Sequence, residues 1–199
     1  MRREITKWHS PNLDKEMDIV AYGDNGFALL MLPTAAADFL EYERFQLIDE
    51  IKPYIEEGKV RVYSINSINN ESWLNDEMHP KDKADRHHQF NEYVFNEVVP
   101  HIHNDSGGLN RIITTGASLG ALHAANMFFK RPDIFGGTIA MSGSYDLSDY
   151  SKGYIDENCY FNSPMHYLQN LEDELWGHDV PHDWPTWRKM LPYVLETKF

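Results

Sequence analysis

A serine flanked by two glycines at fixed spacing carries the clearest chemical signal in this sequence. The segment Gly116-Ala117-Ser118-Leu119-Gly120 has the pattern Gly-x-Ser-x-Gly. A stretch that predicts a strand leads into it, and a stretch that predicts a helix follows it. A sharp strand-to-helix turn exposes a serine hydroxyl as a nucleophile for acyl transfer, and the glycines leave room for the crowded backbone. The alternative is a serine that caps the helix, with glycines that serve packing.

A nucleophilic serine needs a general base, and four histidines follow Ser118 in the chain. They are His123, His166, His178 and His182. His123 falls inside the predicted helix after the serine, where we expect it to pack in the core or to lie on the surface rather than to act as the base. His178 and His182 fall in a turn-rich segment just before the last predicted helix, where this arrangement places its base. We expect His182 to be the base, with His178 as the alternative.

The oxyanion that forms during acyl transfer needs two backbone N–H donors. One is expected to be the N–H of Leu119, the residue after the nucleophile. The other is expected in the turn after the apolar run Phe27–Leu32, where Pro33 is followed by Thr34 and three alanines. Pro33 has no N–H, so Thr34 or Ala35 is the expected donor. The alternative is a plain strand-to-helix turn.

Short apolar runs alternate with longer amphipathic stretches along the chain. Strands are predicted at residues 17–22, 27–32, 60–65, 111–115 and 137–142. Helices are predicted at residues 39–57, 86–101, 117–130, 164–171 and 184–195. Pro53 is expected to bend or divide the first of these helices. Alternating strands and helices predict one α/β domain over residues 1–199, with a mainly parallel sheet and helices on both faces.

The motifs together resemble the esterases of the α/β-hydrolase superfamily, near the esterase D-like and enterochelin esterase-like groups. The resemblance covers most of the chain, and its motifs are LLMLPT at 29–34, GASLGALHAA at 116–125, IAMSGSYDL at 139–147, FNSP at 161–164 and GHDVPHDWPTWRKMLPYVL at 177–195. It implies the α/β-hydrolase fold and a serine carboxylic-ester hydrolase with an acyl-enzyme on Ser118, His182 as general base and no cofactor. A small-molecule ester is the implied substrate. Two alternatives stay open: a catalytically impaired hydrolase-fold protein with a binding or assembly role, and an acyltransferase or thioesterase that uses the same serine.

The family's acid does not carry over to this sequence. It normally follows a further strand before the histidine, but only 28 residues lie between Leu147 and Glu174 inclusive. Two helices, two strands and their connections need about 48 residues. We therefore expect a fold shortened near its C-terminal end, without one strand–helix unit. Asp146 is the candidate acid, with a turn-forming role as the alternative; the weaker candidates are Asp156, Asp179 and Asp183. A lost strand also exposes a sheet edge, which favours a homodimer.

Charge and composition exclude several classes of partner. The 18 basic and 31 acidic side chains give a net charge of −13. A chain this acidic repels phosphate backbones and anionic lipids, so we expect neither nucleic-acid nor membrane binding. Cys159 is the single cysteine, and the N-terminal residues do not resemble a signal peptide. These features favour a cytoplasmic protein.

Other polar and aromatic clusters in the sequence have simpler interpretations. The pairs His87-His88 and His101-x-His103 lack further ligand residues nearby, so no metal site is expected. The carboxylates of the predicted helix 39–57, Glu41 among them, are expected to form a solvated face. The polar loop after the strand at 60–65 contains Asn69 and Trp73. It is expected to line the acyl or alcohol pocket, or else Trp73 is a packing anchor.

Overall fold

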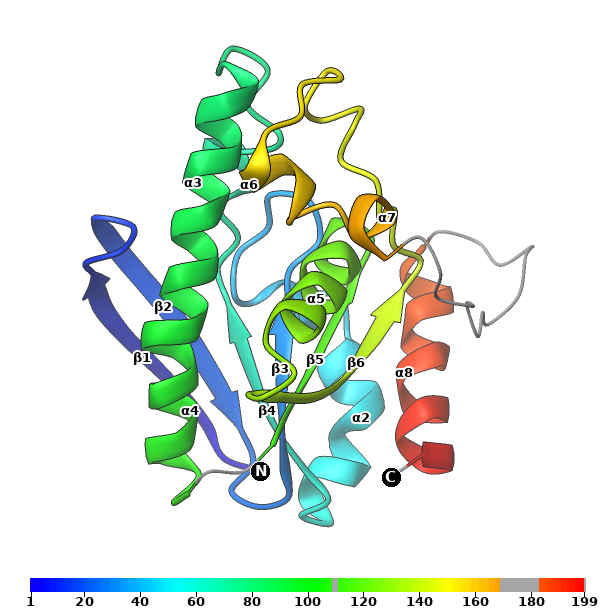
Figure 1. Ribbon diagram of the computed structural model, residues 1–199. Helices are drawn as coiled ribbons and strands as arrows, with labels where there is room; N and C mark the ends of the chain where they lie inside the picture. Colours follow the sequence, from blue (N-terminus) through cyan, green and yellow to red (C-terminus); the bar gives the residue numbers. More distant parts are fainter. Residues whose placement is uncertain (109–110, 169–182, 199) are drawn as a thin grey trace.

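The computed structural model describes residues 1–108, 111–168 and 183–198, and it is built on one six-stranded sheet (Figure 1). The strands are β1 (Arg3–Ser10), β2 (Lys15–Tyr22), β3 (Phe27–Leu32), β4 (Val60–Ile65), β5 (Ile112–Ala117) and β6 (Phe135–Met141). Their order in the sheet is β1-β2-β4-β3-β5-β6. The β1–β2 and β2–β4 pairs are antiparallel, and the other three pairs are parallel. The predicted α/β class with a mainly parallel sheet is therefore confirmed.

Helices cover both faces of the sheet (Figure 1). The helical elements are α1 (Glu41–Arg44), α2 (Leu47–Glu56), η1 (Asn69–Glu71), α3 (Pro80–Tyr93), the π-helical η2 (Val94–Val98), α4 (Val99–Asp105), α5 (Leu119–Lys130), α6 (Glu157–Tyr160), α7 (Pro164–Tyr167) and α8 (Trp184–Lys198). The continuous segment from α3 to α4, together with α5, packs on one face. The other face is covered by α2 and α8.

The alternation of side chains along β3 divides the apolar core into two layers. Leu30 and Leu32 contact the helices on the side of α3, η2, α4 and α5. Leu29 and Met31 point the other way, toward α2 and α8. All four side chains are fully buried, as expected for a central strand of a parallel sheet that is covered on both faces.

Three sequence predictions about the elements differ from the structure. The predicted helix 39–57 is divided at Gln46, whose φ of 63° redirects the chain, and Pro53 lies inside α2 without dividing it. The helix predicted at 86–101 begins earlier, because Pro80 begins α3 and the His79 side chain accepts a hydrogen bond from the Lys81 N–H. The strand β1 was not predicted, because its mostly exposed residues lack an apolar period.

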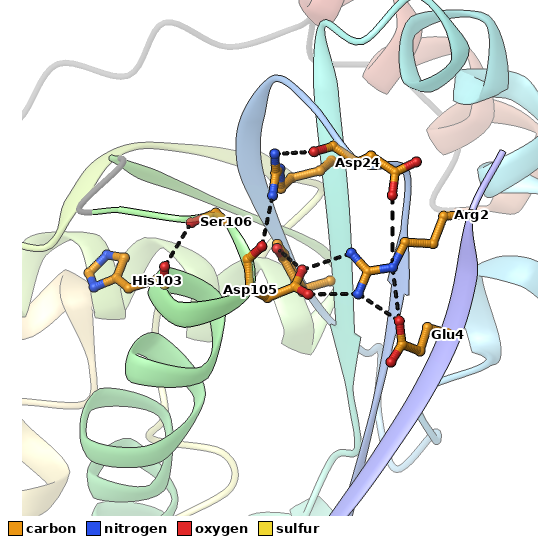
Figure 2. Close-up of polar contacts among 8 residues, drawn as sticks. Arg2, Glu4, Asp24, His103, Asp105 and Ser106 are labelled. Carbon is orange, nitrogen blue, oxygen red and sulfur yellow. Dashed lines mark hydrogen bonds and ion pairs between the residues drawn. The ribbon is translucent and has the colours of Figure 1, made fainter.

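Polar contacts fasten the N-terminal edge of the sheet to the end of α4 (Figure 2). Arg2 makes a bidentate pair with Asp105, with N–O distances of 2.6 and 3.1 Å. The Tyr63 hydroxyl donates to the same carboxylate at 2.6 Å. The Arg2 guanidinium and these hydrogen bonds hold the pKa of Asp105 below its usual range. The antiparallel hairpin of β1 and β2 is therefore joined to the helix layer by a charged bond as well as by sheet pairing.

The opposite edge of the sheet is formed by β6. Within residues 142–168 and 183–198 no strand follows β6, in agreement with the shortened C-terminal part expected from the sequence. The chain instead forms the short helices α6 and α7 and, from Trp184, the helix α8 on the face that α2 also covers. In the described part of the chain, no helix combines the length and apolar character that crossing a membrane requires.

Candidate active site

Ser118 lies in the turn between β5 and α5 with a backbone conformation that is rare for residues other than glycine. Its φ and ψ are 56° and −123°. The turn is held by three backbone hydrogen bonds. Ser118 N donates to Met141 O at 3.0 Å, and Ser118 O accepts from Ala121 N at 3.1 Å and from Leu122 N at 3.3 Å. The Ser118 side chain makes no capping hydrogen bond to α5. The structure thus disfavours the helix-capping interpretation, because capping requires that hydroxyl to accept a backbone N–H.

The two glycines of the motif are required by close backbone contacts. A β-carbon at Gly116 would lie 2.3 Å from the carbonyl group of Gly120. A β-carbon at Gly120 would lie 2.3 Å from Leu32 O and 2.6 Å from Pro33 O. The start of α5 is therefore pressed against the end of β3. This contact brings the turn after β3 beside the turn that holds Ser118.

The turn after β3 contains both candidates for the second oxyanion donor. Thr34 N donates to Glu41 Oε2 at 2.8 Å, and Thr34 Oγ1 donates to Glu41 Oε1. The N–H of Thr34 is thus already engaged by a carboxylate. Ala35 is exposed and has a φ of 31°, and neither its N–H nor that of Leu119 has a hydrogen-bond partner among the described residues. Of the two candidates, Ala35 has the N–H that is open to a ligand.

Glu41 was expected on a solvated helix face, and this expectation is wrong. Its side chain is only 5% exposed and accepts hydrogen bonds from the backbone N–H and the hydroxyl of Thr34. Burial raises the pKa of Glu41, although the hydrogen bonds from Thr34 act in the opposite direction. The sequence offered no direct sign of this role, because charged residues surround Glu41 on the same predicted helix.

His123 lies inside α5 and is buried, as its position in the predicted helix allowed. Its ring stacks on His87 of α3, with ring centroids 4.5 Å apart. Burial lowers the pKa of His123 to about 3, and burial and the neighbouring His123 lower that of His87 well below its ordinary value. Both imidazoles are therefore neutral in the folded protein at neutral pH. His123 therefore has a packing role between α5 and α3.

The expected base, His182, and its alternative, His178, lie outside the described residues. The chain is described again from Asp183, which accepts a hydrogen bond from Thr186 N at 2.9 Å in the first turn of α8. In the same turn, Trp187 Nε1 donates to Ser142 Oγ at 3.1 Å. Ser142 directly follows β6, so the start of α8 is fastened to the carboxyl end of the strand beside Ser118.

Asp146 lies exposed in the loop after β6. Its Oδ1 accepts hydrogen bonds from Ser148 N at 2.8 Å and from Ser148 Oγ at 2.6 Å. These two bonds hold the pKa of Asp146 below its usual range. The geometry is that of a side chain that stabilises its own turn, which is the alternative role considered for this residue.

The structure also gives the surroundings of the residues in the polar loop after β4. Trp73 is 1% exposed and packs with Leu119 and Leu122 in a small apolar cluster, so it is a packing anchor. In the described ranges no three or more His, Cys, Asp or Glu side chains gather in a way that could hold a metal ion. Asn69 of η1 is buried beside Ala35 and His123. Sequence reasoning placed Asn69 in the loop after β4 but gave it no individual role.

Comparison with known proteins places this arrangement in the α/β-hydrolase fold. A ferulic acid esterase superposes with a TM-score of 0.71 at 13% identity, over 98% of this chain and 96% of that one. FphF, a fluorophosphonate-binding serine hydrolase of Staphylococcus aureus, gives 0.65 at 15% identity, over 98% and 97%. An S-formylglutathione hydrolase from Agrobacterium tumefaciens gives 0.65 at 15% identity, over 84% and 70%.

The sequence itself identifies the family. Residues 42–198 match the family described as "Putative esterase", and this chain belongs to that family. No curated protein matches the sequence. Family membership supports a hydrolase activity, in agreement with the resemblance drawn from the motifs.

Proposed function

We propose that this protein is a serine carboxylic-ester hydrolase in which Ser118 forms the acyl-enzyme and His182 is the general base. The observation that carries the proposal is the backbone conformation of Ser118, whose φ is 56°. The turn around it has room only for glycine at positions 116 and 120. Such strain persists where the surrounding structure holds it, and it lifts the hydroxyl above the end of the strand. The side chain is half-buried and makes no capping bond, so it is available to a substrate.

The proposed reaction proceeds in two steps. Ser118 Oγ attacks the ester carbonyl carbon while His182 accepts the hydroxyl proton, and the carbonyl oxygen becomes an oxyanion. The N–H groups of Leu119 and Ala35 stabilise that oxyanion. Collapse of the intermediate expels the alcohol, which takes the proton from His182. Water, activated by His182, then attacks the acyl-enzyme and releases the acid. The reaction needs no cofactor.

The assignment of Ala35 over Thr34 has a physical reason. An oxyanion donor must be free until the transition state forms, but the N–H of Thr34 is bound to Glu41. Moving this N–H would leave one oxygen of a carboxylate that is 5% exposed without its donor, which costs more than a neutral hydrogen bond. Ala35 is exposed, and its N–H has no partner within the described part of the chain.

A fluorophosphonate probe tests the proposal directly. The purified protein is treated with the probe, and the adduct is located by mass spectrometry, with Ser118→Ala as the control. Labelling of Ser118 alone, together with hydrolysis of p-nitrophenyl acetate that Ser118→Ala abolishes, is the expected result. Folded protein that neither reacts nor hydrolyses the ester would favour the catalytically impaired alternative.

The triad acid is proposed to be Asp146, and two variants separate its two roles. Asp146→Asn keeps the shape of the turn and removes the charge. Ser148→Ala removes the hydroxyl bond of the turn and keeps both the backbone N–H bond and the carboxylate. If Asp146 orients the base, Asp146→Asn lowers kcat by up to about 10⁴-fold and Ser148→Ala has a much smaller effect. Equal, small effects of both variants would leave Asp146 a turn residue only.

The assembly and the cellular location are also proposed. The strand β6 ends the sheet order, and an open sheet edge favours pairing with a second copy of the chain. We expect a homodimer, and a gel-filtration mass near the 23.2 kDa of one chain at micromolar concentration would contradict it. A reducing, cytoplasmic location agrees with the buried free thiol of Cys159, whose pKa burial raises to about 11.

A further inference from the structure

The turn that carries Ala35 is held by two side chains that follow β4 in the chain. Ala35 O accepts two hydrogen bonds, one from Ser67 Oγ at 3.0 Å and one from Asn69 Nδ2 at 2.5 Å. Both donors follow β4, which lies beside β3 in the sheet. A φ of 31° is unfavourable for alanine, so the conformation of Ala35 depends on bonds of this kind.

Asn69 also contacts the helix that begins at the nucleophile. Its side chain is 2% exposed, and its Oδ1 lies 3.0 Å from His123 Nε2. Because Ala35 O can only accept, the amide group that faces it is Nδ2, and Oδ1 therefore faces His123. His123 must then donate through a protonated Nε2. One amide thus connects Ala35 to the second turn of α5.

We infer that Asn69 is a positioning residue that sets the distance between the two oxyanion donors. The Leu119 N–H belongs to the first residue of α5, and the Ala35 N–H belongs to the turn after β3. The bridge from His123 through Asn69 to Ala35 O fixes the position of the Ala35 N–H relative to the Leu119 N–H. The inference rests on the proposed esterase function. It adds a group that touches no substrate but determines where the oxyanion is bound.

Asn69→Leu is the main variant, because leucine has a similar size and cannot make either bond. The matched control is Asn91→Leu in α3: Asn91 is 1% exposed, and its Nδ2 donates to Asn162 Oδ1 at 2.8 Å. Each variant removes one buried amide, so both are expected to lower the Tm. Only Asn69→Leu is expected to change the chemical step.

The readout separates positioning from stability. Donors to an oxyanion act in the transition state, so Asn69→Leu should lower kcat for p-nitrophenyl acetate by about 10- to 100-fold with KM within about twofold. A trifluoromethyl ketone, whose carbonyl carbon bonds to Ser118 Oγ and whose oxygen becomes an oxyanion, should bind more weakly by a similar factor. Asn91→Leu should change kcat by less than about threefold, because Asn162 Oδ1 keeps its bond from Asn126 Nδ2 at 2.9 Å and the variant affects stability alone.

A milder variant keeps the test decisive if Asn69→Leu does not fold. His123→Phe keeps a ring against His87 and removes the bond to Asn69 Oδ1, so it breaks the same bridge from its other end. It should lower kcat severalfold with KM unchanged.

The outcomes distinguish the inference from the function on which it rests. Wild-type protein that is inactive and unlabelled at Ser118 would overturn both. Active wild type with an unchanged kcat in folded Asn69→Leu, or in His123→Phe if the first variant is unfolded, would overturn the inference alone. An equal loss of kcat in Asn69→Leu and Asn91→Leu would also overturn it, because a general loss of stability would then explain the effect.

Discussion

The two flanks of Ser118 are built in different ways. On one flank, the ends of β3, β4 and β5 meet at one edge, and α5 is pressed against Pro33 through Gly120. The turn there is held by Glu41 and Asn69, both nearly fully buried. On the other flank, the segment after β6 exposes large apolar side chains, which are Ile155, Tyr160, Phe161 and Met165.

Separate polar contacts hold the second flank to the rest of the protein. Asn162 Oδ1 accepts hydrogen bonds from Asn91 Nδ2 and Asn126 Nδ2, at 2.8 and 2.9 Å. Ser163 Oγ accepts from Leu147 N at 3.0 Å, and the Trp187 bond to Ser142 joins α8 to β6. The two flanks therefore differ in what they hold. The sheet positions Ser118 and the Ala35 turn, the proposed nucleophile and oxyanion site, whereas the proposed proton-transfer groups belong to the part of the chain after β6.

Gly120→Ala should produce the largest effect, because it acts where the first flank is tightest. The added methyl group meets the backbone oxygens of Leu32 and Pro33, which no side-chain rotation can relieve. We expect a loss of about 3 kcal/mol or more in the free energy of unfolding, measured by urea denaturation, with loss of esterase activity. Gly108→Ala is the control, since a β-carbon there meets no described atom within 4 Å. A wild-type midpoint for Gly120→Ala would show that the first flank is less rigid than its contacts indicate.

The stacked pair of His87 and His123 should make the first flank sensitive to acid. Burial lowers the pKa of His123 to about 3, whereas the unfolded chain protonates near the ordinary value of 6.5. Between these values the unfolded state binds the additional proton, so the stability that is present above pH 6.5 is lost as the pH falls toward 3. His123 alone should lower the free energy of unfolding by about 2 kcal/mol between pH 7 and pH 5.

A difference measurement isolates the histidine contribution. The pKa of Glu41 is raised by burial, which acts in the opposite direction at low pH, but it does so in wild type and variant alike. His87→Phe keeps an aromatic ring against His123 and removes one titrating group, so its stability should depend less steeply on pH. Identical slopes for wild type and His87→Phe, from urea denaturation at pH 7, 6 and 5, would contradict a neutral stacked pair.

Local patterns predicted the first flank better than the second. The Gly-x-Ser-x-Gly spacing is a local requirement of one turn, and the structure shows both glycines in the close contacts that explain it. The strands at 27–32 and 60–65 were predicted to the residue, the first from its continuous apolar run and the second from its alternating pattern. Glu41 and Asn69 were not predicted as supports of the Ala35 turn, because their contacts join segments that only the folded sheet brings together.

The second flank depends on contacts that a sequence does not display. Counting residues predicted the shortened sheet, and β6 is its edge. The sequence left the role of Asp146 open, because a carboxylate after a strand suits either a triad acid or a turn. In the structure its Oδ1 accepts hydrogen bonds within its own turn. The resemblance places the base at His182, outside the described residues, so that assignment stays a prediction.

Two variants that each remove one hydroxyl group compare the region beside β6 with the region beside Asp105. Their expected effects are the smallest of those considered. Ser142→Ala removes the acceptor of the Trp187 bond at β6, and Tyr63→Phe removes the donor to Asp105 near β1. Each should lower the free energy of unfolding by about 1 kcal/mol. Because the start of α8 follows His182 in the chain, only Ser142→Ala should also lower kcat for p-nitrophenyl acetate, by about three- to tenfold.

Trp187→Phe removes the same bond from its other side, so it should reproduce the loss of kcat seen with Ser142→Ala. This second variant matters because Ser142 itself lies beside the serine turn, through the bond from Ser118 N to Met141 O. If Ser142→Ala, Trp187→Phe and Tyr63→Phe all leave kcat unchanged while lowering stability, α8 has no part in placing the base. The proton-transfer group would then have to be sought on the first flank, where the sheet already fixes the nucleophile.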